Sequence, residues 1–248
     1  MAGLWCTALG YGNEEIIEVA ERQMRELSFS HMFGGKTHAS AIELADKLAA
    51  MVPIQDGRVF LGNSGSDAND TLLKLIRYHA VVPCQTARIS EFAREQGYHG
   101  VTLASAALTA IPTNHAHFQL PFEALGVLRT GSANYYRGAN DGESEAEFVA
   151  RRAQELEALI LAEGPETIAA MIAEPVSGAG GVIVPPEGYF EAIQTVLDRY
   201  GVWLWDDEVI CGFGRLGTDF GANNMSMRPQ MMTLAKALSS RCTAACRL

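Results

Sequence analysis

The sequence has little cysteine, little positive charge and no long hydrophobic run. Its five cysteines are odd in number and scattered, which argues against a disulfide framework and favours a reducing compartment. No stretch approaches the ~20 apolar residues of a membrane-spanning helix, and no basic segment followed by an apolar run opens the chain. We therefore expect a cytoplasmic protein.

The formal net charge is −10 at pH 7, with 29 acidic and 19 basic residues. This charge argues against nucleic acid or an anionic membrane as a partner. It leaves a phosphate-bearing cofactor open, because backbone N–H groups can bind phosphate. The 248 residues, of which 48% are hydrophobic, are enough for one large α/β domain or two small ones.

Helical and strand-like stretches alternate along the chain. Apolar residues three and four apart predict amphipathic helices, and short apolar runs predict buried strands. The predicted helices cover residues 13–28, 40–51, 67–78, 147–163 and 189–200. The predicted strands cover residues 58–61, 167–173, 202–205 and 231–235. This alternation predicts an α/β fold with a doubly wound, mostly parallel sheet.

Two charged residues follow two of these strands. Asp207 lies in Trp-Leu-Trp-Asp-Asp-Glu-Val, and Lys236 follows Met-Met-Thr-Leu-Ala. Open α/β sheets place ligand sites at the carboxyl ends of their strands, so we expect the two side chains to share a site. A lysine amine forms a Schiff base with an aldehyde, and an acid keeps a pyridine nitrogen protonated. The pair suggests pyridoxal phosphate chemistry.

Each of these residues also has a simpler interpretation. A lone lysine is usually a solvated surface residue, although burial would lower its pKa and expose its nucleophilic lone pair. The adjacent acids Asp206, Asp207 and Glu208 repel one another unless a cation compensates them, and magnesium is the alternative to a pyridinium. The lysine favours the pyridinium. We predict no metal site, because Cys242 and Cys246 have no second pair of ligands.

Three further motifs offer contacts to a flat, phosphorylated ligand. Ser64-Gly65-Ser66 stands between a predicted strand and a helix, where it forms either an anion cradle or a plain helix cap. Tyr98 either stacks on a flat ring or belongs to the core. Glu174 ends a predicted strand, and a buried carboxylate needs a partner or a polar site.

These motifs, in this order, closely resemble the class III, ω-amino-acid–pyruvate group of pyridoxal-phosphate aminotransferases, of fold type I. The matching stretches include Asn-Ser-Gly-Ser-Asp-Ala-Asn-Asp-Thr from Asn63, Tyr-His-Gly-Val-Thr from Tyr98, Ala-Glu-Pro-Val from Ala173, Asp-Glu-Val-Ile-Cys-Gly-Phe-Gly-Arg from Asp207 and Thr-Leu-Ala-Lys-Ala-Leu-Ser-Ser from Thr233. The resemblance implies an N-terminal segment over residues 1–40, an incomplete cofactor-binding large domain over 41–240 and a non-family tail over 241–248.

The resemblance also implies roles for individual residues. Lys236 would attach to the cofactor and shuttle a proton, and Asp207 would pair with the pyridine nitrogen. The other cofactor contacts would be Val209 and Tyr98 on the two ring faces, Ser64, Gly65 and Ser66 at the phosphate, and Glu174 near the hydroxyl. Trp5, Phe33 and Ala179 would line the substrate pocket. The implied reaction transfers an amino group from an amine or ω-amino acid to a keto acid such as pyruvate, in a homodimer.

Some positions depart from the family. Asp67, Asp206 and Gln230 stand where the family has glutamate, a small residue and aspartate. Residues 79–96 keep the family's length but not its basic segment and strand, and residues 241–248 match no family continuation. We therefore expect a chain truncated at both ends, in which these two stretches reflect frame disruption. The alternatives to an active aminotransferase are a non-catalytic fragment that at most binds the cofactor and, more weakly, a same-fold isomerase or decarboxylase.

Overall fold

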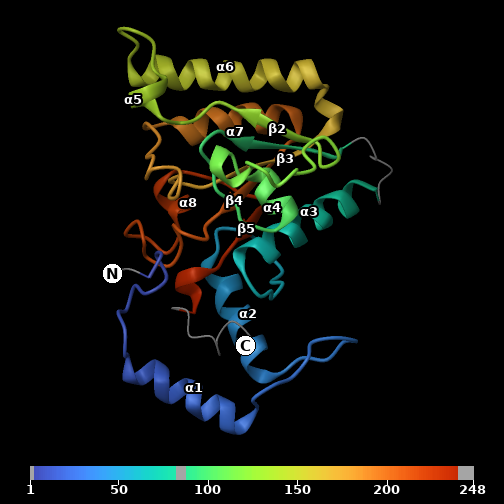
Figure 1. The fold of residues 1–248 in the computed structure, drawn as a ribbon, viewed down its shortest axis with the longest axis vertical. Helices are drawn as coiled ribbons and strands as arrows, with labels where there is room; N and C mark the ends of the chain where they lie inside the picture. The colour runs from blue at the N-terminus through green and yellow to red at the C-terminus, as the bar shows by residue number, and fades with distance from the viewer. Residues whose placement is uncertain (1–2, 82–87, 240–248) are drawn as a thin grey trace.

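A parallel β-sheet lies at the centre of the molecule (Figure 1). The computed structural model describes residues 3–81 and 88–239, and five strands of these residues pair in the order β2-β1-β3-β4-β5. The strands are β1 Ser90–Arg94, β2 Val127–Thr130, β3 Ile168–Ala173, β4 Trp203–Asp207 and β5 Met231–Thr233. Every neighbouring pair is parallel, which confirms the predicted sheet type.

Helices cover both faces of this sheet. The helical segments are α1 Glu14–Glu26, α2 Ala39–Met51, α3 Gly65–Val81, α4 Leu103–Leu108, α5 Tyr135–Gly138, α6 Glu145–Glu163, α7 Tyr189–Tyr200 and α8 Gly221–Asn224, with 3-10 turns η1 Pro112–Asn114, η2 Pro165–Thr167 and η3 Lys236–Leu238. Helices α6 and α7 pack on one face, and α3 and α4 pack on the other (Figure 1). The fold is therefore the predicted doubly wound α/β type.

The helix boundaries follow signals in the sequence. The Ser144 hydroxyl accepts a hydrogen bond from the Glu147 N–H, and the Glu147 carboxylate accepts one from the Ser144 N–H, so this pair caps the start of α6. Helix α7 ends at Gly201, whose φ of 64° is a left-handed conformation that glycine adopts easily. All five predicted helices are formed, with ends shifted by a few residues at most.

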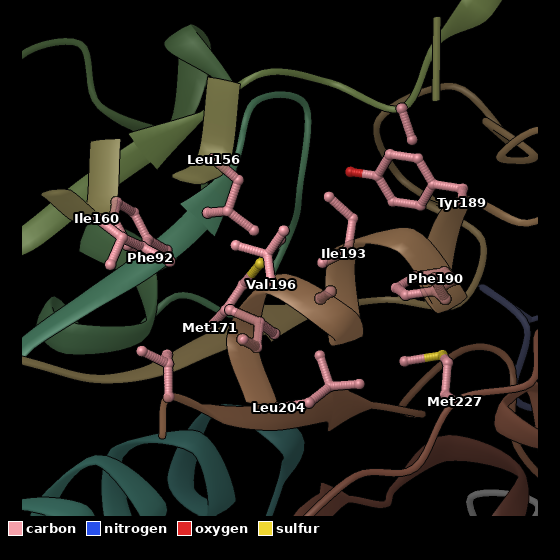
Figure 2. Close-up of a cluster of buried hydrophobic side chains, with 14 of the residues drawn as sticks. Phe92, Leu156, Ile160, Met171, Tyr189, Phe190, Ile193, Val196, Leu204 and Met227 are labelled. Carbon is pink, nitrogen blue, oxygen red and sulfur yellow. The ribbon is translucent and has the colours of Figure 1, made fainter. Parts of the chain in front are cut away.

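Each face of the sheet has its own hydrophobic core. On the α6–α7 face, Phe92, Met171 and Leu204 come from neighbouring strands and pack under α6 and α7, with Phe92 beside Ile160 of α6 (Figure 2). On the other face, Trp205 packs with residues of α3. Successive residues of a strand point to opposite faces, so β4 supplies Leu204 to one core and Trp205 to the other. A fully buried side chain of this size contributes roughly 1.5–3 kcal/mol.

The strands differ from the predictions in three places, one of which is β2 Val127–Thr130, a strand that the sequence analysis did not predict. The predicted strand over residues 58–61 is not formed, because no described strand lies beside it to provide hydrogen-bonding partners, and Phe60 is exposed. Conversely, Ser90–Arg94 forms β1 inside residues 79–96, where the sequence itself gave no strand pattern. Residues 82–87 of that stretch lie outside the described residues, as do residues 240–248.

Strand β1 escaped the sequence prediction because it buries charged residues. All five of its residues are buried, including Glu91 and Arg94. Burial raises the pKa of Glu91 to about 8, although Arg77 lies 3.6 Å away and opposes the shift. The Arg94 guanidinium donates to the Glu174 carbonyl and the Ser177 hydroxyl, which ties β1 to the end of β3.

The N-terminal part of the chain projects from the rest of the molecule. Helix α1 lies apart from the sheet and its helices (Figure 1), and none of its residues is buried. Ile17 and Met24, two apolar residues of this helix, are exposed. No helix in the described parts of the chain is long and apolar enough to cross a membrane.

Candidate active site

A cavity of about 610 Å³ lies where β4 and β5 end and α3 begins. Its lining brings together all eight residues that the sequence suggested for a cofactor: Ser64, Gly65, Ser66, Tyr98, Glu174, Asp207, Val209 and Lys236. They come from five separate segments of the chain. The carboxyl edge of the parallel sheet gathers them, because every strand enters this edge in the same direction.

The start of α3 forms one wall of this cavity. Ser64 caps the helix by accepting a hydrogen bond from the Asp67 N–H at 3.1 Å, so the simpler interpretation of this residue holds as well. The first N–H groups of a helix have no partners within the helix, and its dipole makes this end favourable for an anion. Gly65 allows close packing, since a Cβ there would lie 2.9 Å from Val209 Cγ2.

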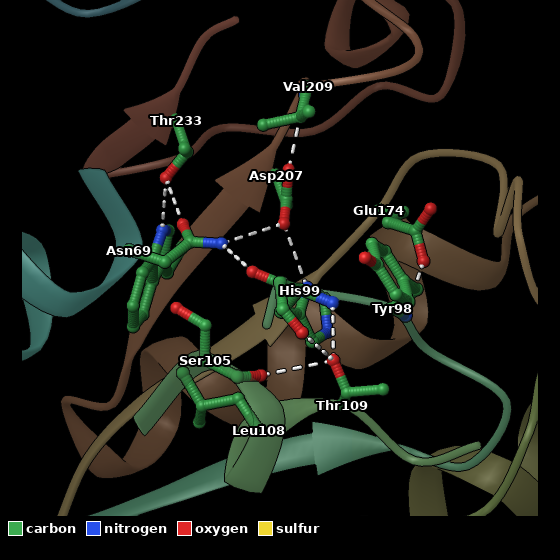
Figure 3. Close-up of polar contacts among 12 residues, drawn as sticks. Asn69, Tyr98, His99, Ser105, Leu108, Thr109, Glu174, Asp207, Val209 and Thr233 are labelled. Carbon is green, nitrogen blue, oxygen red and sulfur yellow. Dashed lines mark hydrogen bonds and ion pairs between the residues drawn. The ribbon is translucent and has the colours of Figure 1, made fainter. Parts of the chain in front are cut away.

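Asp207 is the last residue of β4, and its buried carboxylate accepts three hydrogen bonds (Figure 3). The Val209 N–H donates to Oδ1 at 3.1 Å. On Oδ2, His99 Nδ1 lies at 2.8 Å and Asn69 Nδ2 donates at 3.2 Å. A carboxylate can only accept, so Nδ1 is the protonated nitrogen of the His99 ring when Asp207 is ionised.

Glu174 follows β3 and holds two loops of the site together. Its Oε1 accepts from the Tyr98 N–H at 3.0 Å, and its Oε2 accepts from the Gly178 N–H at 2.9 Å. Burial raises the pKa of Glu174, while His99 and the two N–H donors oppose that shift. Both oxygens are thus engaged with backbone groups, which fixes the position of Tyr98 at the cavity wall.

Lys236 lies three residues beyond β5, at the start of the 3-10 turn η3 Lys236–Leu238. Its side chain contributes to the same cavity as Asp207. Its φ is 45°, a left-handed backbone conformation that non-glycine residues rarely adopt. Such conformations persist where the surrounding structure enforces them, and they cluster at functional sites.

The model of the family described as aminotransferase class-III matches residues 1–248. The chain belongs to this family. Probable gamma-aminobutyrate transaminase 2 of Oryza sativa subsp. indica is 48% identical over 241 residues, covering 97% of this chain and 48% of that protein. The diaminobutyrate–2-oxoglutarate transaminase of Halomonas elongata is 43% identical, covering 96% and 51%. The omega transaminase of Pseudomonas jessenii in complex with PMP is 50% identical, with a TM-score of 0.94, covering 97% and 52%.

The chain spans about half the length of the curated relatives it matches. Class-III aminotransferases use pyridoxal phosphate (PLP), and the residues of this cavity fit that cofactor. The start of α3 suits its phosphate, the buried Asp207 suits its ring nitrogen and Lys236 suits its aldehyde. A side chain in place of Gly65 would clash with Val209, so a glycine here preserves the space available to the cofactor ring.

Three residues with a predicted substrate role lie outside the lining of this aminotransferase cavity: Trp5, Phe33 and Ala179. Phe33 is 84% exposed. The Trp5 carbonyl accepts from Arg215 at 3.2 Å, and Ala179 is exposed in the turn after Gly178. Their role in binding substrate stays a prediction.

Sequence reasoning missed three buried polar residues around Asp207: Asn69, His99 and Thr233. Asn69 lies four residues after Gly65, so helical spacing alone places the two on one face of α3. His99 stands next to Tyr98 but points toward Asp207 rather than toward solvent. The available signal was their spacing: His99 adjoins Tyr98, Asn69 lies about one helical turn after Gly65, and Thr233 lies three residues before Lys236.

The acids on either side of Asp207 belong to the opposite face of the sheet. Asp206 follows Leu204 by two residues and so points toward the α6–α7 side, away from the cavity. Burial raises the pKa of Asp206 well above its ordinary value, and the nearby Glu208 and Asp207 add to the effect. Asp207 is thus separated from its two neighbours, whereas Asp206 and Glu208 stay close to each other and burial raises the pKa of both, which favours their protonated forms. Among the described residues no group of three or more His, Cys, Asp or Glu is arranged to hold a metal ion.

Proposed function

We propose that this chain supplies the cofactor-binding part of an enzyme that transfers an amino group from an amine or ω-amino acid to a keto acid such as pyruvate. One observation carries the proposal: Lys236 and Asp207 line one cavity with the start of α3. When bound, PLP supplies an aldehyde and a ring that withdraws electrons from the substrate carbon.

Each role falls to a residue whose position suits it. The Lys236 amine binds the cofactor and then moves a proton to and from the reacting carbon. Asp207, held by three donors, keeps the ring nitrogen protonated. Tyr98, anchored by Glu174, and Val209 enclose the ring, while Ser64, Gly65 and Ser66 hold the phosphate. Trp5, Phe33 and Ala179 would approach the substrate in the complete assembly.

The relatives support the proposed substrate class, and the exposed rim of the site supports the proposed assembly. The named relatives act as gamma-aminobutyrate, diaminobutyrate and omega transaminases, which supports an ω-amino donor here. Phe60, Leu75 and Val101 all line the cavity and are 67%, 47% and 72% exposed, and this group of exposed apolar side chains supports a homodimer in which a second subunit covers them. The scattered cysteines support a cytoplasmic location, although the Oryza relative is named mitochondrial.

A second candidate is a chain that binds PLP without completing the reaction. The positions of Trp5, Phe33 and Ala179 favour it, because the described residues do not gather these predicted substrate residues at the cavity. The two candidates share the cofactor site and differ only in turnover.

Absorbance spectroscopy of the purified chain with PLP tests both. We expect a visible band from lysine-bound cofactor that is lost in Lys236→Ala and kept in Lys74→Ala, which removes an exposed lysine of α3. A band that bleaches with an amine donor and returns with pyruvate supports turnover. A band that does not change when the amine donor is added supports a chain that binds PLP without turnover. A band that is unchanged in Lys236→Ala refutes the proposed cofactor site.

A further inference from the structure

Asn69 is a fully buried side chain that connects the separate parts of the site (Figure 3). Its Nδ2 donates to the His99 carbonyl at 2.6 Å and to Asp207 Oδ2 at 3.2 Å. Its Oδ1 accepts from the Thr233 hydroxyl at 2.6 Å. One amide on α3 therefore joins the loop that carries Tyr98, the end of β4 and the end of β5.

The surroundings fix the orientation of this amide. Trp205 Nε1 donates to Thr233 Oγ1 at 2.9 Å, which leaves the hydroxyl hydrogen free to point at Asn69 Oδ1. A flipped amide would set its oxygen against the Asp207 carboxylate and the His99 carbonyl. Two contacts between acceptors in a buried site are strongly unfavourable, so only one orientation satisfies all partners.

We propose that Asn69 is a positioning residue: it holds the Asp207 carboxylate where the ring nitrogen of the cofactor meets it, in register with the strand that leads to Lys236. The inference rests on the proposed function in that Asp207 serves the cofactor ring. Asparagine suits this place because one amide offers a donor to the carboxylate and an acceptor to the threonine. Ionised aspartate offers acceptors alone, and leucine offers neither.

Two substitutions at this position have distinct consequences for PLP binding. In Asn69→Leu, Asp207 loses one donor and the His99 carbonyl loses its partner, so PLP should bind roughly tenfold to hundredfold more weakly, the range for a charge-assisted hydrogen bond. In Asn69→Asp, the introduced carboxyl can donate to Asp207 only while it is protonated. The loss of affinity should therefore be larger at pH 9 than at pH 6, a pH profile that a packing defect would not produce.

The experiment is a PLP titration of the full chain by absorbance at pH 6 and pH 9, with Asn140→Asp as the matched control at an exposed position. The control should bind within twofold of the unmodified chain at both pH values. Affinities within twofold for both Asn69 variants, with no difference between the two pH values, would overturn the proposal. If the Asn69 variants do not fold, Thr233→Val decides, because it keeps the asparagine but removes the donor that orients it.

A second measurement separates this inference from the proposed function. Hydrogen–deuterium exchange at the Val209 N–H, which donates to Asp207, reports on the position of the carboxylate in the chain without PLP. We expect faster exchange in Asn69→Leu and in Thr233→Val than in Asn140→Asp. If the unmodified chain binds no PLP, the proposed function fails while this readout still tests the positioning role. Unchanged exchange in both variants refutes that role.

Discussion

Removing the buried carboxyl of Asp206 should stabilise the protein at neutral pH. Asp206 is fully buried, neither of its oxygens meets a donor in hydrogen-bonding geometry within the described residues, and its neighbour Glu208 is a second acid that raises the pKa of Asp206 further. An unsatisfied buried polar group costs about 1–3 kcal/mol, which corresponds to about 2–4 °C in Tm per kcal/mol for a chain of this size. Asp206→Ala should therefore raise the Tm by several degrees at pH 8.

The pH dependence gives the sharper test. Because burial raises the pKa of Asp206 in the folded state, the folded chain binds more protons than the unfolded chain above the ordinary aspartate pKa. Stability is then lost as pH rises from that value, with a slope of up to about 1.4 kcal/mol per pH unit. Asp206→Asn and Asp206→Ala should both remove this slope, while Asp206→Ala should also remove the orphaned polar group.

Thermal denaturation between pH 4 and pH 8 measures the effect, and Asp46→Ala on the exposed side of α2 is the control. Arg94 acts in the opposite direction, because its positive charge lowers the pKa of Asp206 and so favours the ionised carboxylate. Ala93 pairs with Ile172, so the next residue of β1, Arg94, lies beside Ala173 of β3. Ala173 pairs on its other side with Asp206 of β4. The side chains of Arg94 and Asp206 therefore lie on either side of Ala173, on the same face of the sheet. If Asp206→Asn lowers stability at pH 8 and has no effect at pH 4, the carboxylate is ionised and paired with Arg94, and the prediction is refuted.

Three further predictions concern stability. Between about pH 4.5 and 8 the raised pKa of Glu91 keeps this acid protonated only in the folded chain, so the free energy of unfolding should fall as the pH rises. Glu91→Gln should flatten this fall, and a pH profile that denaturant titration finds unchanged would contradict the prediction. Gly100→Ala should lower the Tm sharply, because the φ of Gly100 is 137° and a Cβ there would lie 2.4 Å from Ser66 Oγ. Gly142→Ala is the control: its Cβ would meet no atom within 4 Å, so it measures the cost of the positive φ without a clash. Ser144→Ala should lower the free energy of unfolding by about 1 kcal/mol, because α6 loses its N-terminal cap. Ser144→Asp should keep most of this stability, and calorimetry measures both variants.

The Asp-Asp-Glu sequence at the end of β4 shows how the alternation of side chains along one strand decides which residues reach the site. The sequence places three carboxylates side by side and so suggests one shared cation. In the structure Asp207 enters the cavity, whereas Asp206 points to the other face and Glu208 accepts from the Ala222 N–H at 2.7 Å. Alternation along the strand separates groups that the linear sequence presents as neighbours.

Strand β1 is an element that its own local sequence does not predict. A strand buried on both faces is expected to be apolar, yet β1 contains Glu91 and Arg94. Each of these charges has a partner from a distant segment, Arg77 on α3 and the Glu174 carbonyl after β3. No local pattern can reveal such partners, so the strand could not be predicted from its own residues.

The sequence by itself predicted the five long helices and the α/β class, and it led us to propose the chemistry of Asp207 and Lys236, because these inferences depend on local spacing and on residue type at the ends of apolar runs. Only the tertiary structure decided that Asn69, His99 and Thr233 meet around Asp207, and that Asp206 does not face the site. Hydrogen bonds and burial are set by segments far apart in the chain. The face that a residue presents, and the partner it finds there, follow from the packing of the sheet.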